Sequence, residues 1–284
     1  MRIKTIGVIG AGTMGNGIAH VSALTGFDTI LMDIKDEFVE SGLNTIRTNL
    51  ERQVKKEKIS HSEMDGALNR IRTTIDNSDL SDCDLVVEAA IEDQDTKLNI
   101  FKELDQICKN EAILASNTSS ISITKIASAT NRQNKVIGMH FMNPVPVMKL
   151  VEVVRGKKTD DNTVDKIKEL SENMGKIPVV CNDSPGFVSN RILAPMINEA
   201  VFCLHEGVGT PEAIDSIMKL GMAHPMGPLT LADLIGLDIC LDIIKIIHHD
   251  FGDEKYRPCP LLEKMVAEGN LGRKSGKGFY NYNS

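Results

Sequence analysis

Aromatic side chains and positive charge are both scarce in this sequence of 284 residues. It has no tryptophan and only 4% aromatic residues, and 32 Lys and Arg stand against 39 Asp and Glu, a net charge of −7. A negative protein is a poor general binder of nucleic acids or anionic membranes, so an anionic ligand must meet local positive charge. No stretch offers 18 uninterrupted apolar residues, so we expect no membrane span and no uncleaved targeting segment.

Paired cysteines and metal-ligand clusters are also missing. None of the six cysteines forms a C-x-x-C pair, and several lie in apolar contexts typical of buried thiols. His248 and His249 are adjacent and therefore diverge on a helix, with no thiolate pair beside them. We expect a reducing, cytoplasmic compartment and no bound metal. The sequence also has no G-x-S-x-G elbow and no P-loop.

The residues up to position 183 alternate short apolar runs with amphipathic stretches. This is the pattern of β-α-β units that form a mainly parallel sheet covered by helices on both faces. The predicted strands are Ile3–Ile9, Thr29–Asp33, Asp84–Ala89, Ala112–Ser116, Val136–His140, Met148–Val154 and Pro178–Cys181. We therefore expect an α/β domain over residues 1–183.

After residue 183 the pattern changes to long, mostly apolar helices. Residues 187–206 and 229–247 each fit one helix, and Thr210-Pro211-Glu212 is a typical helix start. We therefore expect an all-α domain over residues 184–284. The helix over 229–247 is apolar around most of its circumference, so it either meets a partner subunit or lies inside a compact bundle.

A glycine-rich segment follows the first predicted strand and opens a helix: Gly10-Ala-Gly12-Thr13-Met14-Gly15. This spacing allows a tight turn, the approach of backbone to a pyrophosphate and close packing of helix on strand. Asp33 closes the second predicted strand, where a carboxylate accepts bonds from the adenosine ribose and disfavours a 2′-phosphate. The sequence predicts a Rossmann-type NAD site. A merely structural glycine turn, with Asp33 as a turn or capping residue, is the alternative.

Polar residues cluster after the later strands, where open α/β sheets place ligands. They are the segment Ser116-Asn-Thr-Ser119-Ser120, then His140 and Asn143, then Glu152 on the following strand. Oxidising an alcohol needs a base with a pKa near neutral, and a carboxylate partner would hold that base in one tautomer. His140 is the best candidate base and Glu152 its candidate partner. The alternative is a structural histidine and an outward-pointing glutamate.

These motifs, taken together with Asp183-Ser-Pro-Gly186-Phe-Val-Ser-Asn190-Arg191 and the tail Gly272-Arg-Lys-Ser-Gly-Lys277-Gly-Phe-Tyr280, resemble the L-3-hydroxyacyl-CoA dehydrogenase family. The similarity covers essentially the whole chain and is greatest to the bacterial 3-hydroxybutyryl-CoA dehydrogenases. It implies reversible NAD-dependent interconversion of (S)-3-hydroxybutyryl-CoA and acetoacetyl-CoA, in fatty-acid or butanoate metabolism.

The resemblance also implies a role for individual residues. His140 would be the catalytic acid/base with Glu152 as its partner, and Ser119 and Asn190 would bond the 3-oxygen or hold the substrate. The implied NAD contacts are the glycine segment, Asp33, Glu92, Lys97, Ser119, Asn143 and Lys277. On the residues alone, Lys97 fits a solvated helix charge as well, and the tail with Lys277 fits a flexible end.

Positive charge for a CoA substrate is available on the helix predicted after Asp33. Arg52, Lys55, Lys56 and Lys58 gather near the end of this helix. Lys56 matches a family position that contacts CoA phosphates, and Arg52 falls where the family often has a second basic residue. Basic residues in the last turns of a helix are otherwise solvated charges that suit its dipole. The family also implies a homodimer formed through the helical domain.

Two other functions fit parts of the sequence. A dehydrogenase of the same fold that acts on a free 3-hydroxy acid or sugar acid would share the Rossmann site. A non-catalytic NAD-binding structural protein would have lost one of Ser119, His140, Glu152 or Asn190, and all four are present.

Overall fold

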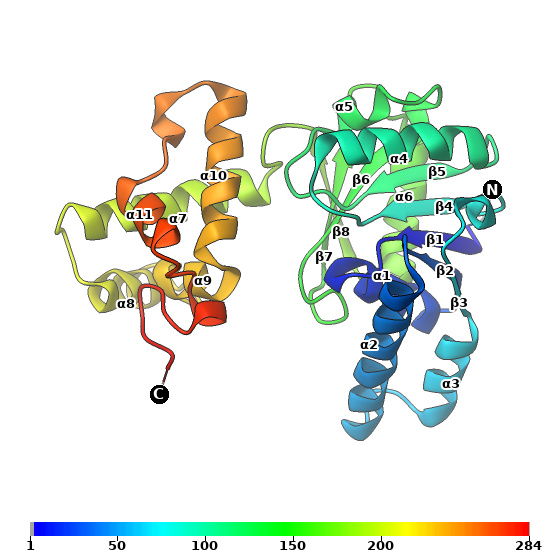
Figure 1. Cartoon of the computed structure of the whole chain (residues 1–284), viewed down its shortest axis with the longest axis horizontal. Helices are drawn as coiled ribbons and strands as arrows, with labels where there is room; N and C mark the ends of the chain where they lie inside the picture. Colours follow the sequence, from blue (N-terminus) through cyan, green and yellow to red (C-terminus); the bar gives the residue numbers. More distant parts are fainter. Residues whose placement is uncertain (1–2, 284) are drawn as a thin grey trace. The chain divides into compact units, whose positions relative to one another are not determined.

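The computed structural model describes residues 3–283. The chain divides into two compact units, Met1–Asp183 and Ser184–Ser284. The first (blue to green in Figure 1) is an α/β unit built on one sheet, and the second (yellow-green to red) is helical. This confirms the predicted fold class. Among the described residues, no helix combines the length and apolarity needed to cross a membrane.

The sheet of the N-terminal unit has eight strands in the order β3-β2-β1-β4-β5-β6-β7-β8. The strands are β1 (Thr5–Ile9), β2 (Asp28–Met32), β3 (Ile71–Thr74), β4 (Leu85–Glu88), β5 (Ile113–Ser116), β6 (Val136–Phe141), β7 (Leu150–Arg155) and β8 (Ile177–Asn182). All neighbouring pairs are parallel except β6 and β7, which are antiparallel. Strand β1 lies between β2 and β4, so the strand order reverses its direction at β1. Open α/β sheets bind ligands at the carboxyl ends of the strands beside such a switch point.

Helices cover both faces of this sheet. They are α1 (Thr13–Leu24), α2 (Asp36–Lys55), α3 (His61–Asn69), α4 (Gln94–Ile107), α5 (Ile123–Ala127) and α6 (Asp161–Asn173), with 3₁₀ turns at Asn77–Leu80 and Gln133–Lys135. Side chains of α1, α2 and α6 form one core with one face of the sheet. Helix α5 packs on the other face, where a Cβ on Gly138 would lie 3.0 Å from Ile123 Cδ1.

Side-chain caps explain where several helices begin. Ser60 and Glu63 form a reciprocal capping box at the start of α3. The side chains of Asp93 and Asp160 accept hydrogen bonds from backbone amides at the starts of α4 and α6. Helix α1 differs, because its first residue follows Gly12, which has no side chain to cap it.

Seven of the eight strands are predicted by the sequence, each with ends within two residues of those observed. Strand β3 is not predicted, because Ile71-Arg-Thr-Thr74 offers one apolar residue and no clear alternation. It is an edge strand that pairs only with β2.

The C-terminal unit is a bundle of α7 (Ser189–His205), α8 (Pro211–Gly221), α9 (Pro228–Ile235), α10 (Leu237–Phe251) and α11 (Pro260–Ala267), with 3₁₀ turns at Glu254–Tyr256 and Arg273–Ser275. The prediction of one helix over 229–247 is wrong. Gly236, at φ +109°, ends α9 and starts α10, and this backbone conformation is not helical. Leu237, Leu241, Ile244 and Ile247 of α10 are buried in the bundle, so much of this apolar helix is internal.

Residues 279–282 pack on this bundle through two buried carboxylates. Asp233 accepts from the amides of Phe279 and Tyr280 and from the hydroxyl of Tyr282, at 2.9–3.0 Å. Asp215 accepts from the Tyr280 hydroxyl at 2.9 Å. The tail that contains Lys277 is therefore fastened to the helical unit.

Candidate active site

The three glycines of the segment after β1 differ in their surroundings. A Cβ on Gly15 would lie 1.6 Å from the carbonyl oxygen of Gly10, and one on Gly10 would lie 2.5 Å from that of Ala89. A Cβ on Gly12 would have no atom within 4 Å. Gly15 is thus required for packing of α1 on the turn, whereas Gly12 leaves open space at the uncapped start of α1, which suits a pyrophosphate.

Asp33 lies just beyond β2 and is tied to this turn. Its Oδ2 accepts from the Ala11 amide at 2.6 Å, and its Oδ1 accepts from the Ile34 amide at 2.7 Å. A cavity of about 700 Å³ begins beside it. The lining includes the glycine turn, Asp33, Ile34, Phe38, Asn77, Ile91, Thr96 and Ile100. An apolar slot that ends at a carboxylate matches the adenosine half of a dinucleotide.

His140 and Glu152 form a buried pair across two strands. They are directly opposite in the antiparallel register of β6 and β7, and His140 Nδ1 donates to Glu152 Oε2 at 2.7 Å. Their side chains are only 7% and 5% exposed. The sequence predicts this pairing. The pairing arises because β7 runs back antiparallel to β6, which places Glu152 beside His140.

The turn after β5, which carries Ser119, is fixed by Glu92. Glu92 Oε1 accepts from Thr118 Oγ1, the Ser119 amide, and the amide and hydroxyl of Ser120, at 2.6–3.0 Å. Burial raises the pKa of Glu92, but Lys97 and these hydrogen bonds outweigh burial and hold the pKa below its usual value. Glu92 is therefore a carboxylate that anchors the Ser119 turn.

Lys97 lies beneath this turn with its side chain only 1% exposed. Its Nζ lies 2.6 Å from Glu88 Oε1 and 3.4 Å from Glu92 Oε2. Interpreting Lys97 as a solvated helix charge is therefore wrong. Glu88, the last residue of β4, was not identified from the sequence. A glutamate in the apolar run Leu85-Val-Val-Glu88 is the available signal, because a charge in a central parallel strand needs a partner.

Asn143 begins the segment between β6 and β7. Lys176 Nζ donates to the carbonyls of Val145 and Met148 and so fastens this segment from one side. On the other side, a Cβ on Gly17 of α1 would lie 2.9 Å from Val145 Cβ. A cavity of about 360 Å³ joins the segment to the glycine turn. Its lining includes Gly12, Thr13, Asn16, Asn49, Asn143 and Pro144. Lys176 was also missed, because nothing in its local sequence marks it as buried.

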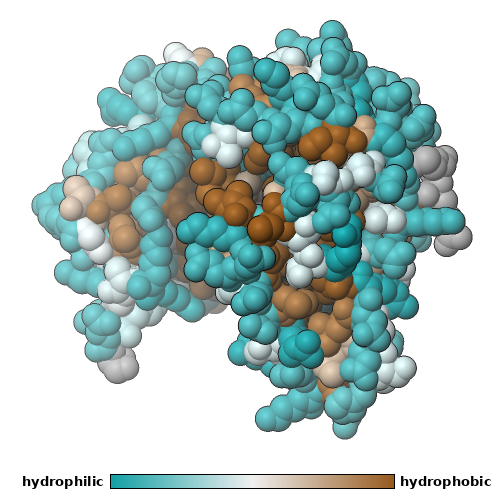
Figure 2. Space-filling model, turned by 45° about the vertical axis from the view of Figure 1, so that its right-hand side comes forward, coloured by the Kyte–Doolittle hydropathy of each residue, from teal (hydrophilic) through white to brown (hydrophobic). Residues whose placement is uncertain are grey.

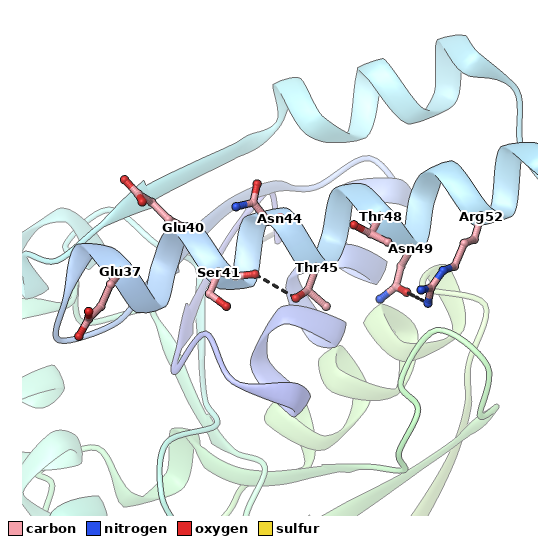
Figure 3. A pocket seen from close by; sticks show the side chains of 8 residues that line it. All are labelled: Glu37, Glu40, Ser41, Asn44, Thr45, Thr48, Asn49 and Arg52. Atoms are coloured by element: carbon pink, nitrogen blue, oxygen red, sulfur yellow. Dashed lines mark hydrogen bonds between the residues drawn. The ribbon is translucent and has the colours of Figure 1, made fainter.

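Polar side chains of α2 line a shallow pocket of about 550 Å³. Figure 3 shows them along one side of this helix: Glu37, Glu40, Ser41, Asn44, Thr45, Thr48, Asn49 and Arg52. Arg52 Nη1 donates to Asn49 Oδ1 at 3.4 Å, near the end of α2. Lys55, Lys56 and Lys58 are exposed just beyond, and Ser41, Thr45 and Asn49 also line the cavity beside Asn143.

Two family models match this chain along nearly its whole length. Residues 5–184 match the model of the 3-hydroxyacyl-CoA dehydrogenase NAD-binding domain, and residues 186–282 match that of the C-terminal domain. The chain belongs to the 3-hydroxyacyl-CoA dehydrogenase family. Its N-terminal unit is therefore an NAD-binding domain, and it is an oxidoreductase chain with NAD as its cofactor.

Curated relatives and solved structures agree with this family. A probable 3-hydroxybutyryl-CoA dehydrogenase of Deinococcus radiodurans is 58% identical over 97% of this chain and 99% of its own. A 3-hydroxybutyryl-CoA dehydrogenase of Bradyrhizobium diazoefficiens is 56% identical, covering 99% and 96%. The crystal structure of the (S)-3-hydroxybutyryl-CoA dehydrogenase of Ralstonia eutropha matches with a TM-score of 0.97 and 50% identity, over 99% of this chain and 100% of that one.

The residues that the sequence predicts for this dehydrogenase lie in both units. The glycine turn, Asp33, Glu92, Lys97, Ser119, His140, Asn143 and Glu152 belong to the N-terminal unit, with Arg52 and Lys56 on α2. Asn190 lies in the first turn of α7, and Lys277 lies in the fastened tail, so both belong to the helical unit. Within residues 3–283, no three His, Cys, Asp or Glu side chains are grouped so that they could hold a metal ion.

Proposed function

We propose that this chain interconverts (S)-3-hydroxybutyryl-CoA and acetoacetyl-CoA, with His140 as the acid/base. The buried 2.7 Å contact between His140 Nδ1 and Glu152 Oε2 carries the proposal. A carboxylate on Nδ1 fixes the tautomer, so proton exchange with the substrate's 3-oxygen takes place at Nε2. During reduction the imidazolium donates its Nε2 proton to this oxygen, and Glu152 stabilises the charge of the imidazolium until then.

The residues around the glycine turn fit NAD. Gly12 leaves the start of α1 open to a pyrophosphate, and Asp33 is placed to accept from a ribose hydroxyl and to repel a 2′-phosphate. When bound, the cofactor supplies or accepts the hydride at C3 of the substrate. We assign the remaining cofactor contacts to Thr13, Met14, Glu92, Lys97, Ser119, Asn143 and Lys277.

Two neutral side chains complete the proposed catalytic set. Ser119 and Asn190 would donate to the 3-oxygen or hold the substrate there. Negative charge builds on this oxygen as the ketone is reduced, so donors aimed at it stabilise the transition state more than the ground state. Asn190 belongs to the helical unit.

The CoA part of the substrate would lie along α2. Arg52 and Lys56 supply exposed positive charge near the end of this helix, on a chain of net negative charge. The α2 pocket and the cavity beside Asn143 share Ser41, Thr45 and Asn49. This continuity supports a path from the CoA phosphates to the reacting thioester.

We also propose a cytoplasmic homodimer that serves fatty-acid or butanoate metabolism. The exposed apolar side chains Ile217, Leu220 and Met222 on and after α8 support an interface on the helical unit. Figure 2 shows the surface of one face, where brown apolar side chains lie among a majority of hydrophilic ones. A sedimentation mass of one chain at micromolar concentration would overturn the dimer.

Replacing the proposed base tests the mechanism directly. We expect His140→Ala to lower kcat for acetoacetyl-CoA reduction about 10²- to 10⁴-fold, because proton transfer loses its donor. NADH affinity should stay near that of the wild type. His249→Ala is the matched control, since the His249 side chain is 89% exposed. Retention of more than about a few per cent of wild-type kcat by His140→Ala would contradict the assigned role.

A further inference from the structure

Glu88 carries a charge at the end of β4 where no solvent reaches it. Its side chain is 0% exposed. Its Oε1 accepts from Lys97 Nζ at 2.6 Å and from the Ala90 amide at 2.7 Å, and its Oε2 accepts from Ser116 Oγ at 2.7 Å. Both oxygens are thus engaged. A carboxylate buried so completely is costly unless it is paired, so its placement calls for an explanation.

Two routes lead from Glu88 to the turn that carries Ser119. The first is a pair of ionic contacts, in which Lys97 Nζ contacts both Glu88 and Glu92. Glu92 Oε1 then accepts a hydrogen bond from the Ser119 amide at 2.8 Å. The second runs through Ser116, whose Oγ donates to Glu88 and accepts from the Thr118 amide at 3.2 Å. Both routes end on consecutive residues of one turn.

The two carboxylates share one ammonium group, the Nζ of Lys97. Glu88 has the shorter contact with Lys97 and is fully buried, whereas the Glu92 side chain is 38% exposed. If Glu88 were neutral, the full charge of Lys97 would act on Glu92 and draw its carboxylate away from the amides of the turn. Glu88 therefore controls how firmly Glu92 holds the turn.

We propose that Glu88 is a positioning residue of this dehydrogenase, which sets the placement of Ser119 through Lys97 and Ser116. This inference rests on the proposed role of Ser119 at the substrate's 3-oxygen. Glu88 itself touches neither substrate nor cofactor in this account. A residue that only stabilised the fold would not affect Ser119 more than any other part of the site.

A double-mutant cycle separates these two roles. We expect Glu88→Gln to lower kcat with acetoacetyl-CoA by about tenfold, because a displaced donor weakens transition-state binding. In a Ser119→Ala background the same change should lower kcat by less than about twofold, since its target is gone. Glu111→Gln, an exposed residue before β5, is the control for loss of one negative charge.

Each outcome decides the question. An equal loss of kcat in both backgrounds, or kcat within about twofold of the wild type for folded Glu88→Gln, would overturn the proposal. If Glu88→Gln does not fold, Ser116→Ala removes one route and leaves every charge in place. It should then lower kcat severalfold, and only when Ser119 is present. A wild type that binds NADH but never oxidises it with acetoacetyl-CoA would instead refute the proposed function.

Discussion

At the scale of single residues, His20 is a buried base without a charged partner. It lies on α1 with 1% exposure, and its Nε2 is 3.0 Å from Gln53 Nε2. Its Nδ1 has no hydrogen-bond partner among the described residues. Burial, together with the nearby charge of Lys176, lowers the pKa of His20 to about 4. The folded protein therefore holds this imidazole neutral.

This predicts a loss of stability in mild acid. The unfolded chain binds a proton at His20 below about pH 6.5, whereas the folded chain resists protonation down to about pH 4. Stability is therefore complete above pH 6.5 and falls with pH through this window, by roughly 3 kcal/mol in all. Between pH 7 and pH 5, denaturant unfolding should show the wild type losing about 2 kcal/mol more than His20→Leu.

The exposed His61 provides the control for this prediction. His61→Gln should follow the wild type, because the His61 side chain is exposed to solvent in the folded chain as it is in the unfolded one. Equal pH dependence of wild type and His20→Leu would show that His20 is not held neutral.

Sequence alone identifies the residues whose chemistry is distinctive, but not those whose role depends on burial. His140 and Glu152 stand out because a base and a carboxylate lie on successive apolar strands. Glu88 and Lys176 were missed, because their importance comes from partners that the fold brings from 9 to 31 positions away. Lys97 could not be separated from a solvated charge until its exposure was known.

At the scale of elements, the turn from β1 into α1 is set by glycines that do different work. Gly15 has a backbone oxygen where a side chain would begin, and Gly12 has none within 4 Å. The motif alone does not separate these roles, because both positions read as glycine. The structure separates the two roles, because a Cβ at Gly15 would meet the protein backbone whereas a Cβ at Gly12 would face open space.

The two glycines should therefore fail in different ways. Gly15→Ala should destabilise the protein by about 3 kcal/mol or more, because its Cβ cannot avoid the Gly10 carbonyl. Gly12→Ala should cost about 1 kcal/mol or less but weaken NADH binding at least about tenfold. Denaturant unfolding and NADH fluorescence titration measure the two effects.

Gly221→Ala serves as the control, because its Cβ would also have no atom within 4 Å but lies at the end of α8. It should change neither property by much. Wild-type NADH affinity in Gly12→Ala would contradict the assigned pyrophosphate contact.

Helices and strands with a strong periodic pattern of apolar residues could be predicted from the sequence. A helix end that depends on one glycine's backbone conformation, and a strand that depends on pairing at the sheet edge, could not. The apolar runs of β1, β4 and β5 mark buried parallel strands. Strand β3 gains its order from pairing with β2 rather than from its own pattern. The break at Gly236 depends on a positive φ, which an isolated glycine in an apolar helix pattern does not reveal.

At the scale of the whole molecule, the residues predicted for the reaction are divided between the two units. The N-terminal unit holds the glycine turn, Asp33 and the His140–Glu152 pair, and the helical unit supplies Asn190 and the fastened tail with Lys277. The tail also fits a flexible end on sequence alone. The buried Asp233 accepts a hydrogen bond from the Tyr280 amide, so the tail is not a flexible end. No local sequence pattern predicts this burial or this contact.

The proposed activity is measured as loss of NADH absorbance when the purified protein meets acetoacetyl-CoA, with parallel reactions that contain NADPH in place of NADH or free acetoacetate in place of the thioester. We predict rapid oxidation of NADH with the thioester, at least about tenfold slower reaction with NADPH because of Asp33, and no saturable reaction with acetoacetate. Equal rates with the thioester and the free acid, or no NADH oxidation by folded protein that binds NADH, would contradict the proposed function.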